Sequence, residues 1–191
     1  MEVSNGPGSG INSFALVSYL SGPLADFLDE VRHDFAPDSR ARAHVTVLPP
    51  RPLQLTPKPP TIENAWTQIR DTLADFQPFS VELGDVEVFR LNCVIYLAIR
   101  AGGVELQRMH DVLNTGLVEF REPFPYHPHV TIVQELLPVD VPAATELSRW
   151  RWSEFRHARS FMVDRLTFVQ NTIDNRWTDL ATLDLASTVT R

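Results

Sequence analysis

The chain carries one short pattern twice, and this repeat narrows the folds that it can adopt. The pattern is histidine, valine, threonine and an apolar residue, which reads HVTV from His44 and HVTI from His129. Each copy follows an apolar strand pattern and an amphipathic helix pattern. Random order would give about 0.2 such matches in this composition. The copies lie 85 residues apart, a longer spacing than that of stacked solenoid repeats, so the sequence predicts a duplicated α+β unit.

Two copies of one unit in a single chain favour two lobes that face each other across an approximate two-fold axis. Each unit is expected to be a strand, a helix and a second strand that opens on the histidine. These elements are expected over residues 13–20, 21–35 and 43–50 in the first unit, and over 93–99, 102–116 and 129–134 in the second. Pro49 and Pro50 should stop the first HVT strand, because proline cannot donate to a sheet ladder.

Further segments complete the expected fold. Thr61 precedes an amphipathic pattern and is expected to cap a helix. Gly84 separates two strand-like runs, which predicts a bulged or a turning pair. The remaining elements are a helix over 140–152 and two long strands over 161–170 and 176–185 joined by a turn at Asp174 and Asn175. The tryptophans of the helix are expected to be buried, and the alternative is that they hold RNA together with the neighbouring arginines.

Composition limits the classes of protein that fit. Hydrophobic residues make up 43% and charged residues 21%, as in a soluble globular protein. The net charge of −7 argues against a protein that coats nucleic acid, but it allows a pocket for one nucleotide or strand end. No segment has the length of a membrane span. The single Cys93 cannot form an intrachain disulfide, so the cytoplasm is the expected compartment.

The first residues differ from the rest of the chain. They are polar and rich in glycine, without the basic start and apolar stretch of a secretory signal. The expected organisation is therefore a flexible tail over 1–11 and a single two-lobed domain over 12–191, which we expect to be a monomer.

The residue types of the repeat point to phosphoryl chemistry. Residues i and i+2 of a strand share a face, so His44 projects with Thr46, and His129 with Thr131. Two imidazoles on opposite sides of a substrate form an acid–base pair near neutral pH. Threonine hydroxyls can donate hydrogen bonds to non-bridging phosphate oxygens. Two copies could therefore hold one phosphoryl group from both sides.

Other kinds of site fit the sequence less well. A zinc site needs three or four ligands, and neither motif has a second ligand at the usual spacing; His127 comes closest, but Pro128 disturbs its strand. There is no serine nucleophile elbow, and a thiol mechanism would depend on Cys93, which lies in an apolar run. Two ordinary hydrogen-bonded strand pairs remain the non-functional alternative. We therefore expect neither a metal ion nor another cofactor.

The two motifs resemble the paired His-x-Thr-apolar signatures of the 2H phosphoesterase superfamily, which includes bacterial 2′-5′ RNA ligase-like proteins and 2′,3′-cyclic nucleotide phosphodiesterases. The resemblance extends to LPPR after the first motif, to FPYHPHVTIVQ around the second, and to the opening over 14–32. It implies a two-lobed α+β fold with a central cleft between the lobes. Each lobe is expected to be a mostly antiparallel sheet with helices on its outer face, and to supply one motif. The resemblance further implies metal-independent chemistry on cyclic or 2′-5′ phosphodiesters. It also implies that His44 and His129 are the acid and base, and that Thr46 and Thr131 bind phosphate.

Other residues are weaker candidates for substrate binding. Arg42 shares the strand face of His44 and could balance phosphate charge, and Arg51 could do the same. Tyr126, like Phe124, could stack on a base, and His127 could line the cleft. His110 falls within a helical pattern and is expected to be solvated.

The sequence therefore predicts hydrolysis of 2′,3′-cyclic phosphates, or reaction at 2′-5′ bonds, in nucleotides or RNA ends. A module that binds such ends without turnover would carry the same motifs, and another cyclic or ADP-ribose-derived phosphodiester would suit the same chemistry. Because the repeat is symmetric, it does not decide which histidine is the base.

Overall fold

The computed structural model describes residues 13–53, 61–171 and 176–186, and their strands form one eight-stranded sheet. The strands are β1 (Phe14–Tyr19), β2 (His44–Arg51), β3 (Phe79–Phe89), β4 (Val94–Ala101), β5 (His129–Val133), β6 (Ser160–Val163), β7 (Arg165–Asn171) and β8 (Trp177–Asp184). The helices are α1 (Gly22–Phe35), α2 (Ile62–Thr72), α3 (Gly103–Leu113) and α4 (Val141–Glu154), with a 3-10 turn, η1 (Gly116–Val118). The predicted α+β class is confirmed. The predicted tail over 1–11 and the turn at Asp174 and Asn175 lie outside the described residues.

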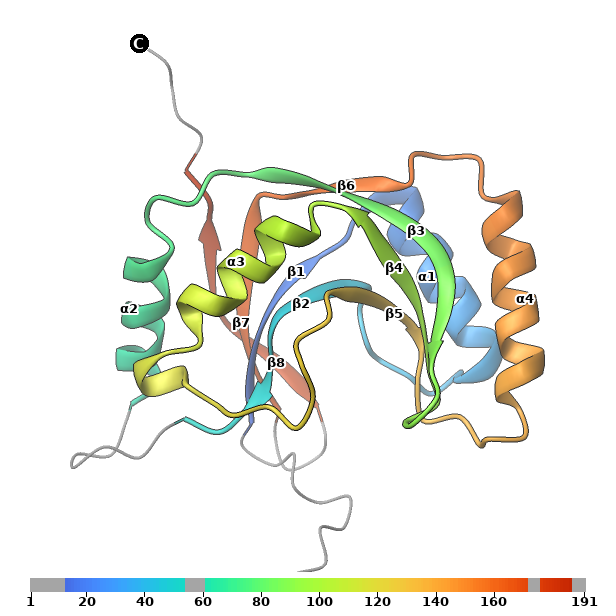
Figure 1. The fold of residues 1–191 in the computed structure, drawn as a ribbon, viewed down its shortest axis with the longest axis horizontal. Coiled ribbons are helices and arrows are strands. Elements are labelled where there is room, and N and C mark those ends of the chain that lie inside the picture. Colours follow the sequence, from blue (N-terminus) through green and yellow to red (C-terminus); the bar gives the residue numbers. More distant parts are fainter. Residues whose placement is uncertain (1–12, 54–60, 172–175, 187–191) are drawn as a thin grey trace, which may run out of the picture.

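The sheet is antiparallel throughout, in the order β6-β3-β4-β5-β2-β1-β7-β8. The two predicted units, β1-α1-β2 and β4-α3-β5, supply the four central strands, and the two HVT strands β2 and β5 are neighbours (Figure 1). The expected two lobes with a sheet each are not confirmed, because the pairing of β2 with β5 joins both halves into one sheet. The pairing brings the two motifs together at the centre.

Each connecting helix packs mainly on the half of the sheet that the other unit supplies. Helix α1 contacts β5, and helix α3 contacts β2 and, less extensively, β4 of its own unit. The stripe of α1 that faces the sheet includes Leu24, Leu28 and Val31, and these side chains share one hydrophobic core with the motif residues Val45 and Val130. Figure 1 shows α2 and α3 toward one end of the sheet and α1 and α4 toward the other. None of the described helices is long and apolar enough to cross a membrane.

The predicted strand over 161–170 proves to be two strands. β6 pairs with β3 at one edge of the sheet, whereas β7 pairs with β1 and β8 in the other half, and only Asp164 separates them. Both segments, SFMV and RLTFVQN, are strand-like runs, so the sequence pattern does not reveal the break. Since one residue connects an edge strand to a strand in the opposite half of the sheet, the sheet must be strongly curled. The Asp164 carbonyl also accepts a bond of 2.7 Å from the Leu185 N–H, just after β8.

Two other strand predictions are settled by the register. β2 continues through Pro49 and Pro50, so the expected stop is wrong. The register of β1 against β2 shifts between Phe14 and Leu16, next to the prolines, and a bulge tolerates proline because it interrupts the ladder. Gly84 lies within the single continuous strand β3 at a register shift against β4, so the bulged alternative is confirmed and the turning one is not.

Candidate active site

The two motifs form a two-by-two array on the face of the sheet that is turned away from the shared core. The strands are joined by the central valines of the motifs, Val45 and Val130. An antiparallel register around this pair places His44 across from Thr131, and Thr46 across from His129. The two valines are fully buried, whereas the four polar side chains are partly exposed. Each histidine therefore has a threonine two residues along its own strand and a second threonine across the ladder.

Both imidazoles are anchored in the same way. The Nδ1 atom of His44 lies 2.7 Å from the carbonyl oxygen of Arg42, and the Nδ1 atom of His129 lies 2.7 Å from that of His127. A carbonyl oxygen can only accept, so Nδ1 carries the proton in each ring. The Nε2 atom of each ring is then the nitrogen that is left to exchange protons.

A cluster of charged and aromatic side chains flanks His44. The Tyr19 ring lies edge-on to the imidazole, with 6.3 Å between centroids. The Arg42 guanidinium lies 3.5 Å above the Tyr19 ring and pairs with Asp179, which also accepts a 2.7 Å bond from the Tyr19 hydroxyl. Burial lowers the pKa of His44, and the positive charges of Arg32 and Arg42 lower it further, against the opposing effect of the Arg42 carbonyl.

His129 has a more aromatic setting. Its ring lies edge-on to Phe89 and at a steep tilt to Tyr96, with centroids 5.0 and 5.2 Å away. Phe89 and Tyr96 stack on each other at 4.0 Å. Burial lowers the pKa of His129, and His127 and His44 add electrostatic contributions in the same direction. In the ladder, His44 and His129 lie diagonally across the Val45–Val130 pair.

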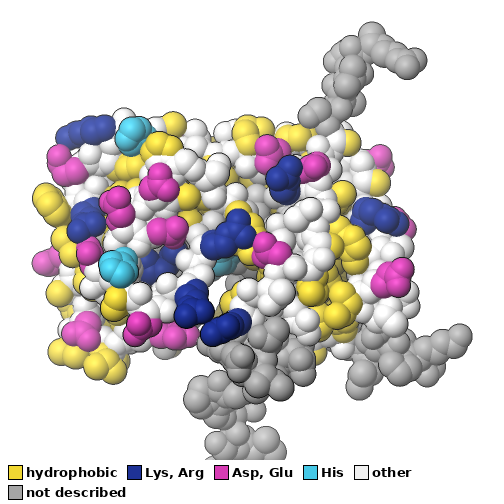
Figure 2. All heavy atoms as spheres, turned by 180° about the vertical axis from the view of Figure 1, so that it is seen from behind, with side chains coloured by type: hydrophobic (Ala, Val, Ile, Leu, Met, Phe, Trp, Pro, Cys, Tyr) yellow, Lys and Arg dark blue, Asp and Glu magenta, His cyan; other side chains and the backbone are white. Residues whose placement is uncertain are grey.

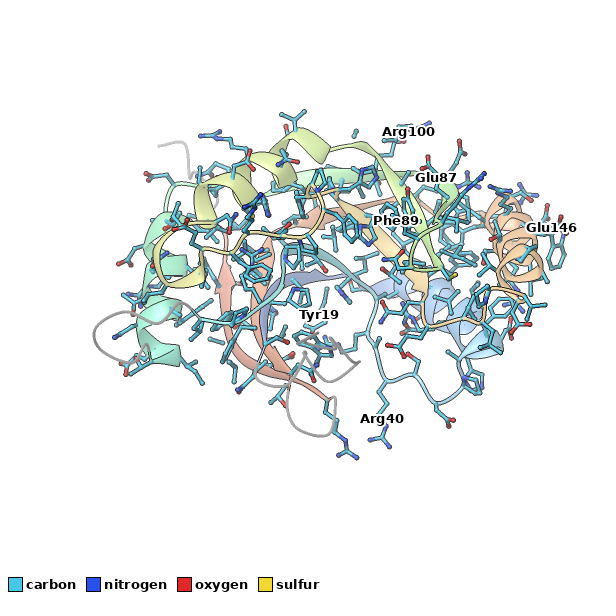
Figure 3. The ribbon with its side chains drawn as sticks, turned by 60° about the horizontal axis from the view of Figure 1, so that its bottom comes forward. Tyr19, Arg40, Glu87, Phe89, Arg100 and Glu146 are labelled. Carbon is cyan, nitrogen blue, oxygen red and sulfur yellow. The ribbon has the colours of Figure 1, made fainter. Side chains whose placement is uncertain are left out.

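The surface beside the first motif is hollowed and charged. A hollow of about 660 Å³ is lined by α1 and the loop that precedes β2, and its charged residues include Arg32, Arg40, Arg42, Asp29 and Glu30. Figure 2 shows basic side chains near the middle of the back face, with acidic ones around them. In Figure 3, Arg40 extends away from the sheet while Tyr19 lies close to it. The surface next to His44 therefore carries charges of both signs.

A comparison with protein families identifies the chain. A family model described as the 2′-5′ RNA ligase superfamily matches residues 20–175, a span that includes both motifs. The chain belongs to the 2′-5′ RNA ligase superfamily. The resemblance to 2H phosphoesterases that the motifs suggested is thereby confirmed. A search of curated proteins found no match.

Solved structures share the fold of this superfamily member at low sequence identity. A crystal structure of a phosphoesterase is 17% identical, with a TM-score of 0.59, and the match covers 93% of this chain and 99% of that one. E. coli LigT complexed with NADP+ is 17% identical, with a TM-score of 0.59, and the match covers 94% of this chain and 100% of that one. E. coli LigT complexed with 3′-AMP is 15% identical, with a TM-score of 0.58, and the match covers 92% of this chain and 99% of that one. At these identities the likeness shows a common fold.

The weaker candidates occupy different surroundings in this superfamily member. Arg42 lies beside His44 but is already paired with Asp179. His127 is exposed next to His129, with ring centroids 6.5 Å apart. Tyr126 stacks its ring on His110 at 4.1 Å, and its hydroxyl donates to the Thr46 carbonyl. Tyr126 is therefore engaged on both its ring and its hydroxyl.

Two sequence-based expectations are wrong. Arg51 does not face a substrate: its side chain is 1% exposed and it binds Glu122 and Asn114. His110 is not solvated, because it is 6% exposed and lies 2.9 Å from the same glutamate.

Sequence reasoning also missed Arg32, which is buried on the inner stripe of α1. Its helical spacing from Leu28 is the one signal that could have indicated burial.

The acidic and metal-ligating side chains form no cluster at the array. Throughout the described ranges, no group of three or more histidine, cysteine, aspartate or glutamate residues is arranged to hold a metal ion. The residues at the array itself are two imidazoles and two hydroxyls. These groups can exchange protons and donate hydrogen bonds to an oxyanion.

Proposed function

We propose that this protein is a phosphoesterase that acts on 2′,3′-cyclic phosphates or 2′-5′ phosphodiesters of nucleotides or RNA ends through acid–base catalysis by His44 and His129. The observation that carries the proposal is the array of two imidazoles and two threonines, with both Nδ1 atoms anchored on backbone carbonyls. This anchoring gives both rings the same tautomer and presents Nε2 of each to a shared group. Membership of the superfamily and the shared fold with LigT support the same chemistry.

The proposed reaction uses one imidazole as base and the other as acid. The neutral imidazole takes a proton from water through Nε2, and the water oxygen forms a bond to phosphorus. The bond from phosphorus to one ribose oxygen breaks, and the protonated imidazole gives its proton to that oxygen. The product is a ribose monophosphate, with the two imidazoles left in exchanged protonation states. The hydroxyls of Thr46 and Thr131 donate to the non-bridging oxygens, whose charge grows in the transition state.

The electrostatic surroundings of the two histidines suit a reaction that needs one base and one acid. Burial and neighbouring charges lower the pKa of both histidines, so at neutral pH the free protein holds both largely neutral. A bound phosphate brings negative charge between them and raises the pKa of each, since an opposite charge favours the protonated form. Substrate binding therefore helps to create the acid that the second half of the reaction needs.

Turnover of a defined substrate tests the proposal. Purified protein is incubated with 2′,3′-cyclic AMP and with short RNAs ending in a 2′,3′-cyclic phosphate, in excess EDTA. Monophosphate should form, and His44→Ala and His129→Ala should each lower kcat by about 10²–10⁴ with an unchanged circular dichroism spectrum. Tight binding of these compounds with no product would instead favour a module that recognises phosphorylated ends.

A further inference from the structure

The two motif strands are joined by few backbone contacts. In the part of the chain that the structure describes, β2 and β5 share one ladder pair, Val45 with Val130, whereas β1 pairs with β2 from Phe14 to Tyr19. A single pair fixes the register of two strands but leaves them free to splay on either side of it. The array needs its histidines and threonines held to within a fraction of an ångström, because misplacement by about 1 Å can cost 10²-fold in rate. Other contacts must therefore set the separation of the motifs.

Arg32 supplies one such contact. Its side chain is 8% exposed on α1, and its guanidinium donates to the carbonyl oxygens of Thr131 at 3.1 Å and Ile132 at 3.0 Å. The same group donates to the carbonyl of Ala41 at 2.7 Å, three residues before His44. Arg32 thus links the segment that enters the first motif to the threonine of the second.

Tyr126 supplies the matching contact in the other direction. It lies three residues before His129, and its hydroxyl donates to the carbonyl oxygen of Thr46 at 2.7 Å. Its ring stacks on the buried His110 ring with only 2° between the planes. Burial raises the pKa of the Tyr126 hydroxyl well above its ordinary value, so the group keeps its proton and remains a donor. Tyr126 thus links the segment that enters the second motif to the threonine of the first.

We propose that Arg32 and Tyr126 are positioning residues that cross-tie the two motifs and so set where the threonine hydroxyls lie relative to a bound phosphate. Each tie runs from the entry of one motif to the threonine carbonyl of the other, once through an arginine and once through a tyrosine. The proposal rests on the proposed function for its kinetic consequence, but the ties themselves are hydrogen bonds that can be tested without turnover. Neither residue touches the reacting atoms.

The kinetic test uses variants that remove a tie and little else. Tyr126→Phe deletes the hydroxyl and keeps the stacked ring, and Arg32→Lys keeps the charge but reaches fewer acceptors. Each should lower kcat for 2′,3′-cyclic AMP by about 10-fold and leave KM within about two-fold. Arg159→Met is the matched control, because Arg159 also donates to a backbone carbonyl, that of Trp152, but far from the array. Its kcat should stay at the wild-type value.

Double-mutant cycles give the decisive pattern. Because Tyr126 acts through Thr46, adding Tyr126→Phe to Thr46→Val should lower kcat little further, whereas adding it to Thr131→Val should lower kcat by the full factor. Arg32→Lys should behave in the opposite way, with its effect lost on Thr131→Val and kept on Thr46→Val. Equal effects on both threonine backgrounds, or an unchanged kcat in either single variant, would overturn the positioning role and leave general destabilisation as the explanation.

Amide hydrogen exchange of the substrate-free protein separates this proposal from the proposed function. Tyr126→Phe should raise exchange in peptides from β2, and Arg32→Lys in peptides from β5, with β7 and β8 unchanged in both. Unchanged exchange in β2 and β5 would show that the ties are absent, whatever the kinetics. If the wild-type protein hydrolyses no phosphodiester, the proposed function fails, and the exchange result alone then decides whether the ties exist.

Discussion

His44 and His129 share one geometry and differ in what surrounds them. His44 lies near two permanent cations, Arg32 and Arg42, and His129 lies among aromatic rings and a third imidazole, His127. Burial is the largest cause of the lowered pKa in both. Unlike surroundings therefore shift the pKa of both imidazoles in the same direction.

The threonine hydroxyls can be tested without disturbing the strands. Thr46→Val and Thr131→Val keep the β-branched shape and remove the hydrogen-bond donor, so strand propensity hardly changes. If each hydroxyl binds the charge that develops on phosphate, kcat should fall by about 10–10³ with a smaller change in KM. Steady-state kinetics measures this. Thr182→Val, an exposed threonine on β8, is the control, and a loss of the same size there would contradict the assignment.

The lowered pKa of His44 also makes a prediction about stability. As pH falls, the unfolded chain protonates this residue near pH ~6.5, before the folded protein does, so folding stability is present above that pH and is lost as pH falls through the folded-state pKa. The melting temperature of His44→Asn should therefore fall less between pH 7.5 and pH 5 than that of the wild type. Differential scanning calorimetry measures the two slopes, and equal slopes for His44→Asn and the wild type would contradict the account.

At the scale of elements, α2 shows a local signal that predicts structure well. Thr61 accepts a 3.0 Å bond from the Asn64 N–H, which satisfies one free donor of the first turn, as the sequence predicted. Thr61→Ala should therefore lower the free energy of unfolding by about 1 kcal/mol. Urea denaturation measures this change. Because the cap is far from the array in the fold, kcat should stay the same, and a matching loss of activity would contradict that separation.

Local patterns predicted the helices, most strands and the α+β class because each depends on residues close in sequence. The break at Asp164 and the pairing of β2 with β5 depend on contacts between distant strands, which alternation does not encode. Helix α4 illustrates the limit for single side chains: of two neighbouring tryptophans expected to be buried, Trp152 is 4% exposed and Trp150 is 62% exposed. The motif residues were identifiable because the sequence repeats them.

At the scale of the whole molecule, a buried polar network joins the end of β2 to α3 and the segment after it. Arg51 binds Glu122 and donates to Asn114 at 2.6 Å and to the Val118 carbonyl at 3.0 Å, and His110 lies 2.9 Å from Glu122. A buried charge that loses its partner destabilises the fold, because the remaining charge is neither paired nor solvated. The network thus ties distant parts of the chain into one cooperative unit.

Removing the centre of this network should have a large effect on stability. Arg51→Ala removes the arginine partner of the mostly buried Glu122 and should lower the free energy of unfolding by about 3–5 kcal/mol. The exposed pair of Arg100 with Glu82 gives the control, and Arg100→Ala should leave the urea midpoint nearly unchanged. Equal midpoints for the two variants would contradict the role of the network.

The pH dependence of kcat/KM tests the two-histidine mechanism most directly. The reactive form of the free protein has one imidazole neutral and the other protonated, so wild-type kcat/KM for a 2′,3′-cyclic nucleotide should follow a bell. Because the pKa of both His44 and His129 is lowered, the maximum should lie on the acid side of pH ~6.5. In His44→Ala and His129→Ala the residual rate should lose opposite limbs, which identifies the base as the residue whose variant loses the acid limb. A flat wild-type profile, or the same two limbs in both variants, would contradict the mechanism.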